Sequence, residues 1–346
     1  MAENQNPLSV AIIGTGRIAG GYDQDKYSTE RGVYSHAGAY QRNGKFALKT
    51  VYDINRDRAL EFKRYWNAEK LAVGLSEIRS QYHDIISVCT PDKTHFEIVT
   101  TLIENRCCRT IFTEKPLASD LQQIKEIIEA ARAANINVVV NLQRNFDRLY
   151  ETLHEAVSLN PENLLTISAY YMKGLSHSGV TMIDTLTAIC GYPRKILAFD
   201  RTWNREIEEY SYDFILFYDC FNVIVKSIDS DFHLYTYHIF ELDLLLSDKR
   251  ITINDNSRKV DKRQLTNYAY SGVNILDDSR SVTEMTEYDI AILKGVEYIY
   301  QITCGLRTHT INTPEQSYNN RMITDKIITS YESNEKVYMN EDGWLR

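Results

Sequence analysis

Cysteine is scarce in this sequence, and basic residues are outnumbered by acidic ones. The six cysteines in 346 residues include no C-x-x-C spacing, so neither a disulfide framework nor a metal site is expected. The adjacent Cys107 and Cys108 are interpreted as buried thiols beside a strand. Lys and Arg total 39 against 47 Asp and Glu, giving a net charge of −8 with no long basic run. A nucleic-acid partner bound through phosphate neutralisation is therefore not expected.

Long apolar runs are also missing. No window approaches the roughly 18 apolar residues that a membrane helix needs. The N-terminal sequence MAENQNPLS lacks the cationic start and apolar stretch of a secretory signal. With 43% hydrophobic and 25% charged residues, the chain has globular composition and a length that fits about two domains. We therefore expect a soluble, cytoplasmic protein that does not bind membranes.

The first part of the chain alternates short β-branched runs with helical patterns. Buried strands are predicted at residues 9–13, 47–52, 84–89, 110–113 and 137–140. Between them, apolar residues recur at helical spacing in residues 56–65, 94–105 and 121–134. This alternation predicts an α/β fold with a doubly wound parallel sheet, a Rossmann domain over residues 1–142.

The pattern changes near residue 145. Helices are predicted at residues 149–158, 287–305 and 314–331, and the chain between them is rich in Tyr, Ile and Phe. Several of these runs, such as KILAFDRTW and FNVIVKSID, alternate apolar with polar residues, as in a sheet with one covered face. A second, α+β domain is therefore predicted over residues 143–346. The alternative that its C-terminal helix packs back on the first domain stays open.

A glycine-rich turn follows the first predicted strand. Its form, G-x-G-x-x-A, allows a tight turn, close approach of the backbone to a pyrophosphate, and close packing of helix on strand. Backbone N–H groups at the following helix start would meet the anion. The pattern predicts a dinucleotide-binding site whose cofactor-binding residues include Gly14, Thr15, Gly16, Arg17 and Ile18.

Asp53, after the second predicted strand, indicates which dinucleotide is bound. A carboxylate there accepts hydrogen bonds from the adenosine ribose and repels a 2′-phosphate, which favours NAD over NADP. Arg56 and Arg58 lie close enough in sequence to moderate that repulsion, and a helix N-cap is the alternative role of Asp53. Asp53 also follows Gly16 by 53 − 16 = 37 positions, where about 20 are usual. The excess lies in residues 20–34, interpreted either as a lid or as a neutral surface insertion.

Four short segments, each just after a predicted strand, make the chain resemble the Gfo/Idh/MocA oxidoreductases, NAD(P)-dependent enzymes that act mostly on sugars and inositols. Those segments are Gly14–Ala19, Cys89-Thr90-Pro91 with His95, Glu114-Lys115-Pro116, and Asn141–Phe146. The resemblance implies an open, mainly antiparallel sheet in the second domain and a face-to-face homodimer or homotetramer. It also implies cofactor contacts at Thr90, Pro91, His95 and Glu114, Lys115 at the hydride-transfer site, and a cis bond before Pro116.

The resemblance breaks where the family commonly carries a histidine. The equivalent stretch holds His177, Thr181 and Asp184, at the i, i+4, i+7 spacing of one helical face, and Thr181 stands at the histidine position. A threonine hydroxyl can bind a substrate but cannot act as a base near neutral pH. Three explanations are open: Lys115 moves the proton alone, His177 has taken over, or the usual dehydrogenation has been lost. A solvated residue near a helix start is the alternative role of His177.

These residues lead to one main hypothesis and two alternatives. The main one is an NAD-dependent oxidoreductase acting on a sugar or nucleotide-activated sugar, with a role in surface-glycan precursor synthesis. Its catalytic candidates are Lys115, His177 and Thr181; these three, with Arg144 and Asp184, are the substrate-binding candidates. Arg144 suits a phosphate or carboxylate, or an interdomain salt bridge. The alternatives are a non-catalytic NAD-binding sensor, and a lyase or epimerase that oxidises its substrate transiently.

Overall fold

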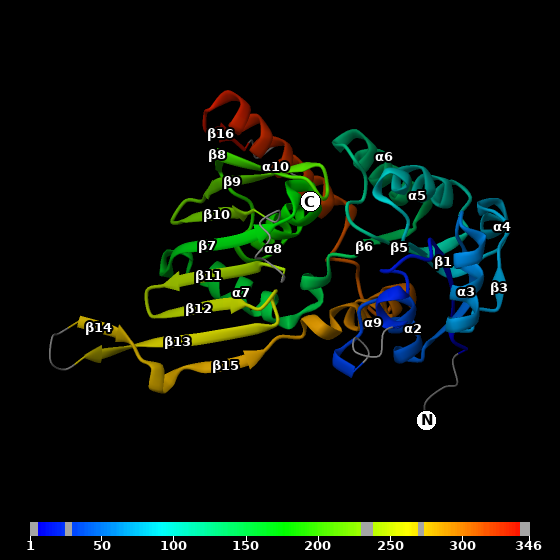
Figure 1. The fold of residues 1–346 in the computed structure, drawn as a ribbon, viewed down its shortest axis with the longest axis horizontal. Coiled ribbons are helices and arrows are strands. Elements are labelled where there is room, and N and C mark those ends of the chain that lie inside the picture. Colours follow the sequence, from blue (N-terminus) through cyan, green and yellow to red (C-terminus); the bar gives the residue numbers. More distant parts are fainter. Residues whose placement is uncertain (1–5, 25–29, 230–237, 269–272, 340–346) are drawn as a thin grey trace. The chain divides into compact units, whose positions relative to one another are not determined.

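A computed structural model describes residues 6–24, 30–229, 238–268 and 273–339 (Figure 1). The chain divides into two compact units. The first contains the residues up to Phe146 together with Asp289–Tyr318, and the second contains Asp147–Tyr288 together with the residues from Asn319. Among the helices of the described residues, none combines the length and apolarity of a membrane-spanning segment.

The first unit is built on a parallel sheet, as predicted. Its described strands lie in the order β3-β2-β1-β4-β5-β6, that of a doubly wound dinucleotide-binding fold. The strands are β1 (Leu8–Ile13), β2 (Phe46–Tyr52), β3 (Lys70–Leu71), β4 (His83–Val88), β5 (Cys108–Thr113) and β6 (Asn137–Val140). The five predicted strands are confirmed. Two-residue β3 is too short to give a periodic pattern.

Helices cover both faces of this sheet. They are α2 (His36–Asn43), α3 (Arg56–Trp66), α4 (Leu75–Arg79), α5 (His95–Glu104), α6 (Leu121–Ala134) and α9 (Ala291–Thr303). Helix α6 shows why the sequence folds so: Asp120 caps its start, Asn135 ends it in the left-handed conformation, and its isoleucines face the core. Helix α9 is distant in sequence but belongs to this unit, where Val296 and Ile299 join the core.

The segment that lengthens the distance from Gly16 to Asp53 interrupts the first helix of the fold. The His36 N–H donates to the Ile18 carbonyl at 3.0 Å, and the Ala37 N–H donates to the Ala19 carbonyl at 2.8 Å. Helix α2 therefore continues the turn begun at Ile18 with the i→i−4 bonding of a helix, as if residues 22–35 were absent. Residues 25–29 of the predicted lid or insertion lie outside the described residues, so its role stays a prediction.

Both described ends of that segment are fixed to the first unit. The buried Asp23 carboxylate accepts hydrogen bonds from the Tyr34 and Ser35 N–H groups and from the Ser35 hydroxyl. The Val33 N–H donates to the Asp289 carbonyl at 2.8 Å. A Cβ at Gly32 would lie 2.1 Å from that carbonyl oxygen, so this close approach requires glycine.

The second unit contains a mainly antiparallel sheet, as the family resemblance implied. The described strands run β14-β13-β12-β11-β7-β10-β9-β8-β16, β15 also pairs with β13, and β7 and β10 are parallel. The strands are β7 (Leu164–Met172), β8 (Lys195–Asn204), β9 (Glu209–Phe217), β10 (Asn222–Ile228), β11 (Phe240–Leu246), β12 (Lys249–Asn254), β13 (Lys259–Tyr268), β14 (Val273–Leu276), β15 (Val282–Met285) and β16 (Val337–Tyr338). Residues 233–237, the start of the Tyr- and Leu-rich run HLYTYHIFELDLLL that leads into β11, lie outside the described residues.

One face of this sheet is covered and the other is open. Helices α7 (Arg148–Leu159), α8 (Val180–Cys190) and α10 (Pro314–Ser333) contribute Leu153, Ile183 and Ile327 to the core beneath it. The open face carries exposed Phe199, Ile224 and Leu245 among polar side chains.

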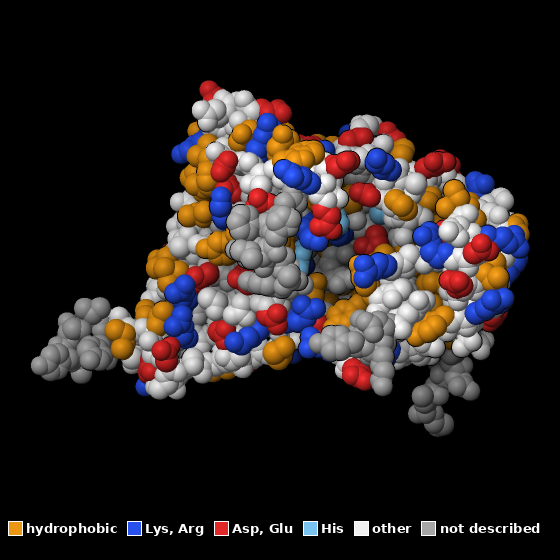
Figure 2. All heavy atoms as spheres, in the orientation of Figure 1, with side chains coloured by type: hydrophobic (Ala, Val, Ile, Leu, Met, Phe, Trp, Pro, Cys, Tyr) orange, Lys and Arg blue, Asp and Glu red, His pale blue; other side chains and the backbone are white. Residues whose placement is uncertain are grey.

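On the surface that Figure 2 draws, Lys and Arg lie interspersed with Asp and Glu, as the mixed composition predicts.

Candidate active site

The glycine-rich turn has the geometry that a dinucleotide requires. Gly14 has φ = 87°, and a Cβ there would lie 2.7 Å from the Cys89 backbone. Only glycine fits this crossing of the β1 and β4 ends. A Cβ at Gly16 would meet nothing within 4 Å, so this side of the turn is open to a ligand. The loop residues therefore fit a bound pyrophosphate, as the motif predicts.

The flanking motif residues divide between surface and core. The Arg17 guanidinium is exposed and lies over the Tyr22 ring, 4.9 Å from its centroid. Ile18 packs against the core of the first unit, and Ala19 is fully buried, which allows the close helix–strand packing expected of the third small residue. Direct cofactor contacts by Arg17 and Ile18 stay predictions.

Asp53 is joined to the glycine-rich turn and to a cation. Its carboxylate accepts from the Thr15 N–H at 2.7 Å, from the Thr15 hydroxyl at 2.9 Å and from Arg58 Nη2 at 2.7 Å. Burial raises the Asp53 pKa, but the Arg58 guanidinium and the Thr15 and Asn55 N–H groups outweigh it and hold the pKa below its usual value. The cap of α3 is Asn55, so Asp53 does not have the alternative capping role.

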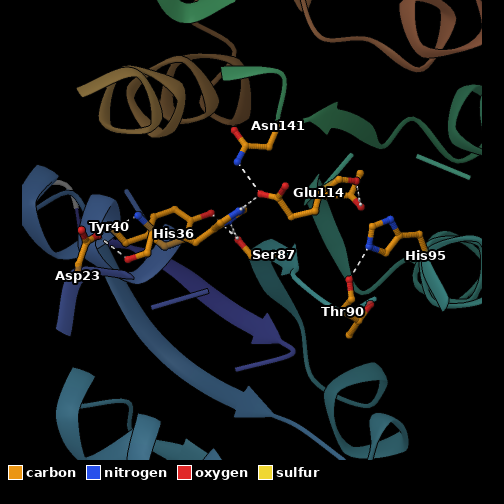
Figure 3. Close-up of polar contacts among 10 residues, drawn as sticks. Asp23, His36, Tyr40, Ser87, Thr90, His95, Glu114 and Asn141 are labelled. Atoms are coloured by element: carbon orange, nitrogen blue, oxygen red, sulfur yellow. Dashed lines mark hydrogen bonds and ion pairs between the residues drawn. The ribbon is translucent and has the colours of Figure 1, made fainter. Parts of the chain in front are cut away.

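Two turns at the ends of β4 and β5 are tied together by one buried histidine. His95 is 1% exposed; its Nδ1 lies 2.7 Å from the Pro116 carbonyl oxygen and its Nε2 lies 2.8 Å from the Thr90 carbonyl oxygen. The imidazole thus links the Thr90-Pro91 turn to the Lys115-Pro116 turn (Figure 3), whose peptide bond is cis, as the resemblance implied. Because both ring nitrogens face protein carbonyls, His95 supports the site through these turns.

Glu114 and Lys115 follow β5 directly. The Glu114 carboxylate accepts from His36 Nε2 at 3.0 Å and from the Asn141 amide at 2.6 Å, as Figure 3 shows. Burial raises the Glu114 pKa, but His36, Asn141 and the Lys115 charge outweigh it and hold the pKa below its usual value. Lys115 is half-buried, with its charge beside this carboxylate. Arg144, in the 3₁₀ turn Gln143–Phe146, is 6% exposed.

In the second unit, the predicted single helical face is divided. His177 lies in a π-helical turn, Gly174–Gly179, while Thr181 and Asp184 lie on α8. Lys173 and Gly174 have positive φ, and Glu209 accepts a hydrogen bond from the Ser176 N–H, so the chain enters α8 through a wider turn. His177 is exposed, Thr181 is half-buried, and the buried Asp184 accepts from Asn320 at 2.7 Å.

The sequence hypotheses missed several polar partners of these residues. His36, Tyr40, Ser87 and Asn141 surround Glu114 directly or through one another. His36 and Tyr40 are four residues apart on α2, a spacing that places both on one helical face. That spacing could have been noticed, whereas the contact with Glu114 depends on the interrupted helix. Within the described residues, no cluster of His, Cys, Asp and Glu has the arrangement of a metal site.

Comparisons with known proteins agree with this geometry. Residues 8–142 match a family model described as an oxidoreductase family with an NAD-binding Rossmann fold. The chain is 27% identical over 151 residues to a myo-inositol 2-dehydrogenase of Thermotoga maritima, covering 43% of this chain and 40% of that protein. It is 27% identical over 158 residues to a D-glucoside 3-dehydrogenase of Escherichia coli, covering 45% and 41%. The matched region thus spans less than half the length of these relatives.

The fold similarity extends over nearly the whole chain. A levoglucosan dehydrogenase, solved as a complex with NADH and L-sorbose, superposes with a TM-score of 0.72 at 15% identity, covering 96% of this chain and 99% of that one. The family model thus identifies residues 8–142 as an NAD-binding Rossmann domain of the Gfo/Idh/MocA oxidoreductase type, and the superposition shows that the fold of the whole chain is similar to that of the levoglucosan dehydrogenase.

Proposed function

We propose that this protein is an NAD-dependent dehydrogenase that oxidises a hydroxyl group of a sugar, a polyol or a nucleotide-activated sugar. The observation that carries the proposal is the set of groups at the carboxyl ends of β1, β2, β4 and β5. The open side of Gly16, the carboxylate of Asp53 and the ammonium of Lys115 all belong to this edge. Ligands of doubly wound sheets bind at that edge.

In this proposal, bound NAD supplies the hydride acceptor. Lys115 holds the substrate hydroxyl and, in its neutral amine form, accepts the hydroxyl proton as the hydride leaves the carbon for NAD, which leaves a carbonyl group and the Lys115 ammonium. The Glu114 carboxylate and the His95 link to Pro116 keep the lysine-bearing turn in one position. Thr181 could donate a hydrogen bond to a substrate oxygen, but its hydroxyl is too weak an acid and too weak a base to move the proton.

NAD is the proposed cofactor, and Arg58 limits how strongly it is preferred. Asp53 would repel a 2′-phosphate, but its charge is partly neutralised by a guanidinium whose side chain is 51% exposed. An exposed arginine at this place could also turn toward a phosphate. We therefore expect NAD to bind more tightly than NADP by a modest factor.

The substrate class follows from the relatives and from one buried cation. Both relatives named above act on inositol or a glucoside. Arg144 suits a phosphate or carboxylate, which is why a nucleotide-activated sugar stays within the proposed class. A role in surface-glycan precursor synthesis is a further prediction from the sequence.

A non-catalytic NAD-binding sensor is the second candidate. Thr181 favours it, because this α8 position lacks the histidine common in the family. The half-buried Lys115 beside an ionised Glu114 favours catalysis instead.

The open sheet face of the second unit supports a homodimer or homotetramer. Ile224 is 43% exposed and Leu245 39% exposed on adjoining parts of that face, and burial of such side chains would favour association. Sedimentation of the wild type beside Ile224→Lys tests this proposal. A shift toward monomer only in the variant supports it, and a monomeric wild type contradicts it.

One experiment tests the function. The purified protein is incubated with NAD and, in turn, with inositols, glucosides and nucleotide sugars, while NADH absorbance is followed. Substrate-dependent NADH formation that is lost in Lys115→Met supports a dehydrogenase. Tight NAD binding without turnover on any of the panel favours the sensor.

A further inference from the structure

A buried chain of polar groups runs from the interior of the first unit to Glu114. Tyr40 Oη lies 2.8 Å from Ser87 Oγ, which lies 3.1 Å from His36 Nδ1, and His36 Nε2 lies 3.0 Å from Glu114 Oε1 (Figure 3). His36 and Ser87 are fully buried and Tyr40 is 2% exposed. The large majority of polar groups this deep in proteins make hydrogen bonds, and these three make them with one another.

The charge of Glu114 fixes the direction of its hydrogen bond with His36, and the directions of the other two are those that a neutral His36 imidazole requires. An ionised carboxylate only accepts, so His36 Nε2 must carry the hydrogen that it donates. A neutral imidazole then has its lone pair on Nδ1, where the Ser87 hydroxyl donates. Tyr40 in turn donates to the Ser87 oxygen. Burial raises the Tyr40 pKa further, so its hydroxyl stays protonated and available as the terminal donor.

The interrupted helix is what brings His36 to Glu114. The Ser35 side chain caps α2 by accepting from the Gly38 N–H, and Asp23 holds Ser35 by accepting its hydroxyl hydrogen at 2.6 Å. These contacts fix the first turn of α2, so that His36 faces β4 and the end of β5. The ring of His36 also packs against Phe112 on β5, with centroids 4.4 Å apart.

We propose that His36 is a positioning residue of the reaction: by donating to Glu114 it fixes the carboxylate that sets the orientation and charge state of Lys115. This inference rests on the proposed function, in which Lys115 moves the substrate proton. The groups that face Glu114 are His36 from α2, Asn141 after β6, Lys115 in its own turn, and the Cys89 thiol after β4. The Asn141 amide does not titrate. Burial and the Glu114 charge raise the pKa of the Cys89 thiol, which therefore stays neutral. His36 is thus the partner whose replacement tests the proposal.

Two conservative variants separate the roles of the two ring nitrogens. In His36→Gln the side-chain amide can replace the Nε2 donor, whereas in His36→Asn it reaches only the Nδ1 position. His83→Leu is the matched control, because His83 is a buried histidine of the same unit at the opposite end of β4. For each protein, lysines are reductively methylated with ¹³C-formaldehyde, and the Lys115 resonance, assigned by its absence in Lys115→Arg, is titrated by NMR.

The Lys115 pKa is expected to fall by about one unit in His36→Asn, because a displaced carboxylate no longer stabilises the ammonium. It should stay near the wild-type value in His36→Gln and His83→Leu. The pH-independent kcat/KM should fall roughly tenfold in His36→Asn alone, with NAD affinity unchanged. Equal Lys115 titrations in the Asn and Gln variants, or an equal shift in His83→Leu, would overturn the proposal.

The NMR titration needs no substrate, so it separates this inference from the proposed function. Absence of turnover in the wild type contradicts the dehydrogenase proposal, while the Lys115 titration still decides the positioning role of His36. If His36→Asn fails to bind NAD, the comparison of His36→Gln with wild type decides: an unchanged Lys115 titration supports the Nε2 donor, and a shifted one counts against it.

Discussion

The Arg58 guanidinium contacts both oxygens of the Asp53 carboxylate, with Nη2 at 2.7 Å from Oδ1 and 2.8 Å from Oδ2. The carboxylate expected to discriminate against NADP is therefore partly neutralised by its own neighbour. This relationship makes cofactor preference adjustable in two directions by single substitutions.

Asp53→Ala should reduce the ratio of NAD affinity to NADP affinity, because it removes the charge that repels a 2′-phosphate. Arg58→Ala should raise this ratio about tenfold, ~1.4 kcal/mol, because it leaves that charge unneutralised. Fluorescence titrations with NADH and NADPH measure both effects. Arg56→Ala, an exposed arginine two positions away, is the control and should change neither affinity. Tighter NADP than NAD binding by the wild type would contradict the assignment of Asp53.

Replacing the two glycines of the cofactor loop should have different effects: Gly14→Ala should reduce stability, and Gly16→Ala should reduce NAD affinity. Gly14→Ala puts a Cβ 2.7 Å from the Cys89 backbone at positive φ, so we expect a loss of stability above the ~1–2 kcal/mol of the left-handed conformation alone. Gly16→Ala meets nothing within 4 Å, so urea unfolding should be unchanged while NAD affinity falls roughly tenfold or more. Equal loss of stability in both variants would show that Gly16 is needed by the fold instead of the ligand.

Most of the first unit could be predicted from sequence, because its strands and helices carry local periodic patterns. Helix α6 was predicted with the bounds it has, since a cap, an apolar stripe and an asparagine end coincide there. The sequence predicts that a helix resumes near Ser35–Tyr40, as α2 does, but the bond from His36 to Ile18 could not be predicted, because no local pattern shows which earlier turn the helix continues. The contact of His36 with Glu114 was missed for the same reason, and that of Asn141 was missed because it depends on the pairing of β6 with β5. The π-helical turn at His177 was not predicted either, because it depends on a hydrogen bond to Glu209, a residue of β9 that is distant in sequence.

Acid should destabilise the protein through two histidines of the first unit. Burial lowers the pKa of His83 and of His309 below the usual 6.5, so near that pH the unfolded chain binds more protons than the folded one. Their contribution to stability is therefore complete above about pH 6.5 and is lost progressively as the pH falls below it. Urea unfolding at about pH 7.5 and about pH 5.5 measures this loss.

His83 allows the acid effect to be separated from other titrating groups. Within the described residues, neither of its ring nitrogens has a hydrogen-bond partner. His83→Leu should raise the free energy of unfolding by about 1 kcal/mol at neutral pH and reduce the loss between the two pH values. His154→Leu, which removes a histidine of the second unit, is the comparison variant for the general effect of replacing a histidine by leucine. The same pH dependence in wild type and His83→Leu would contradict the role of His83.

The transfer of the substrate proton should depend on Lys115 much more than on His177. Hydride transfer from a sugar carbon leaves a hydroxyl proton that Thr181 cannot accept near neutral pH, and Lys115 lies on a turn held by Glu114 and His95. Lys115→Met keeps most of the side-chain length and removes the charge, so turnover should fall roughly 10²-fold or more. His177 is exposed in its π-helical turn, so His177→Asn should cost severalfold at most. Steady-state kcat values, with NAD affinity measured separately, test the pair. If His177→Asn abolishes turnover and Lys115→Met stays within severalfold of wild type, the two roles are reversed, because the proton then leaves through the second unit.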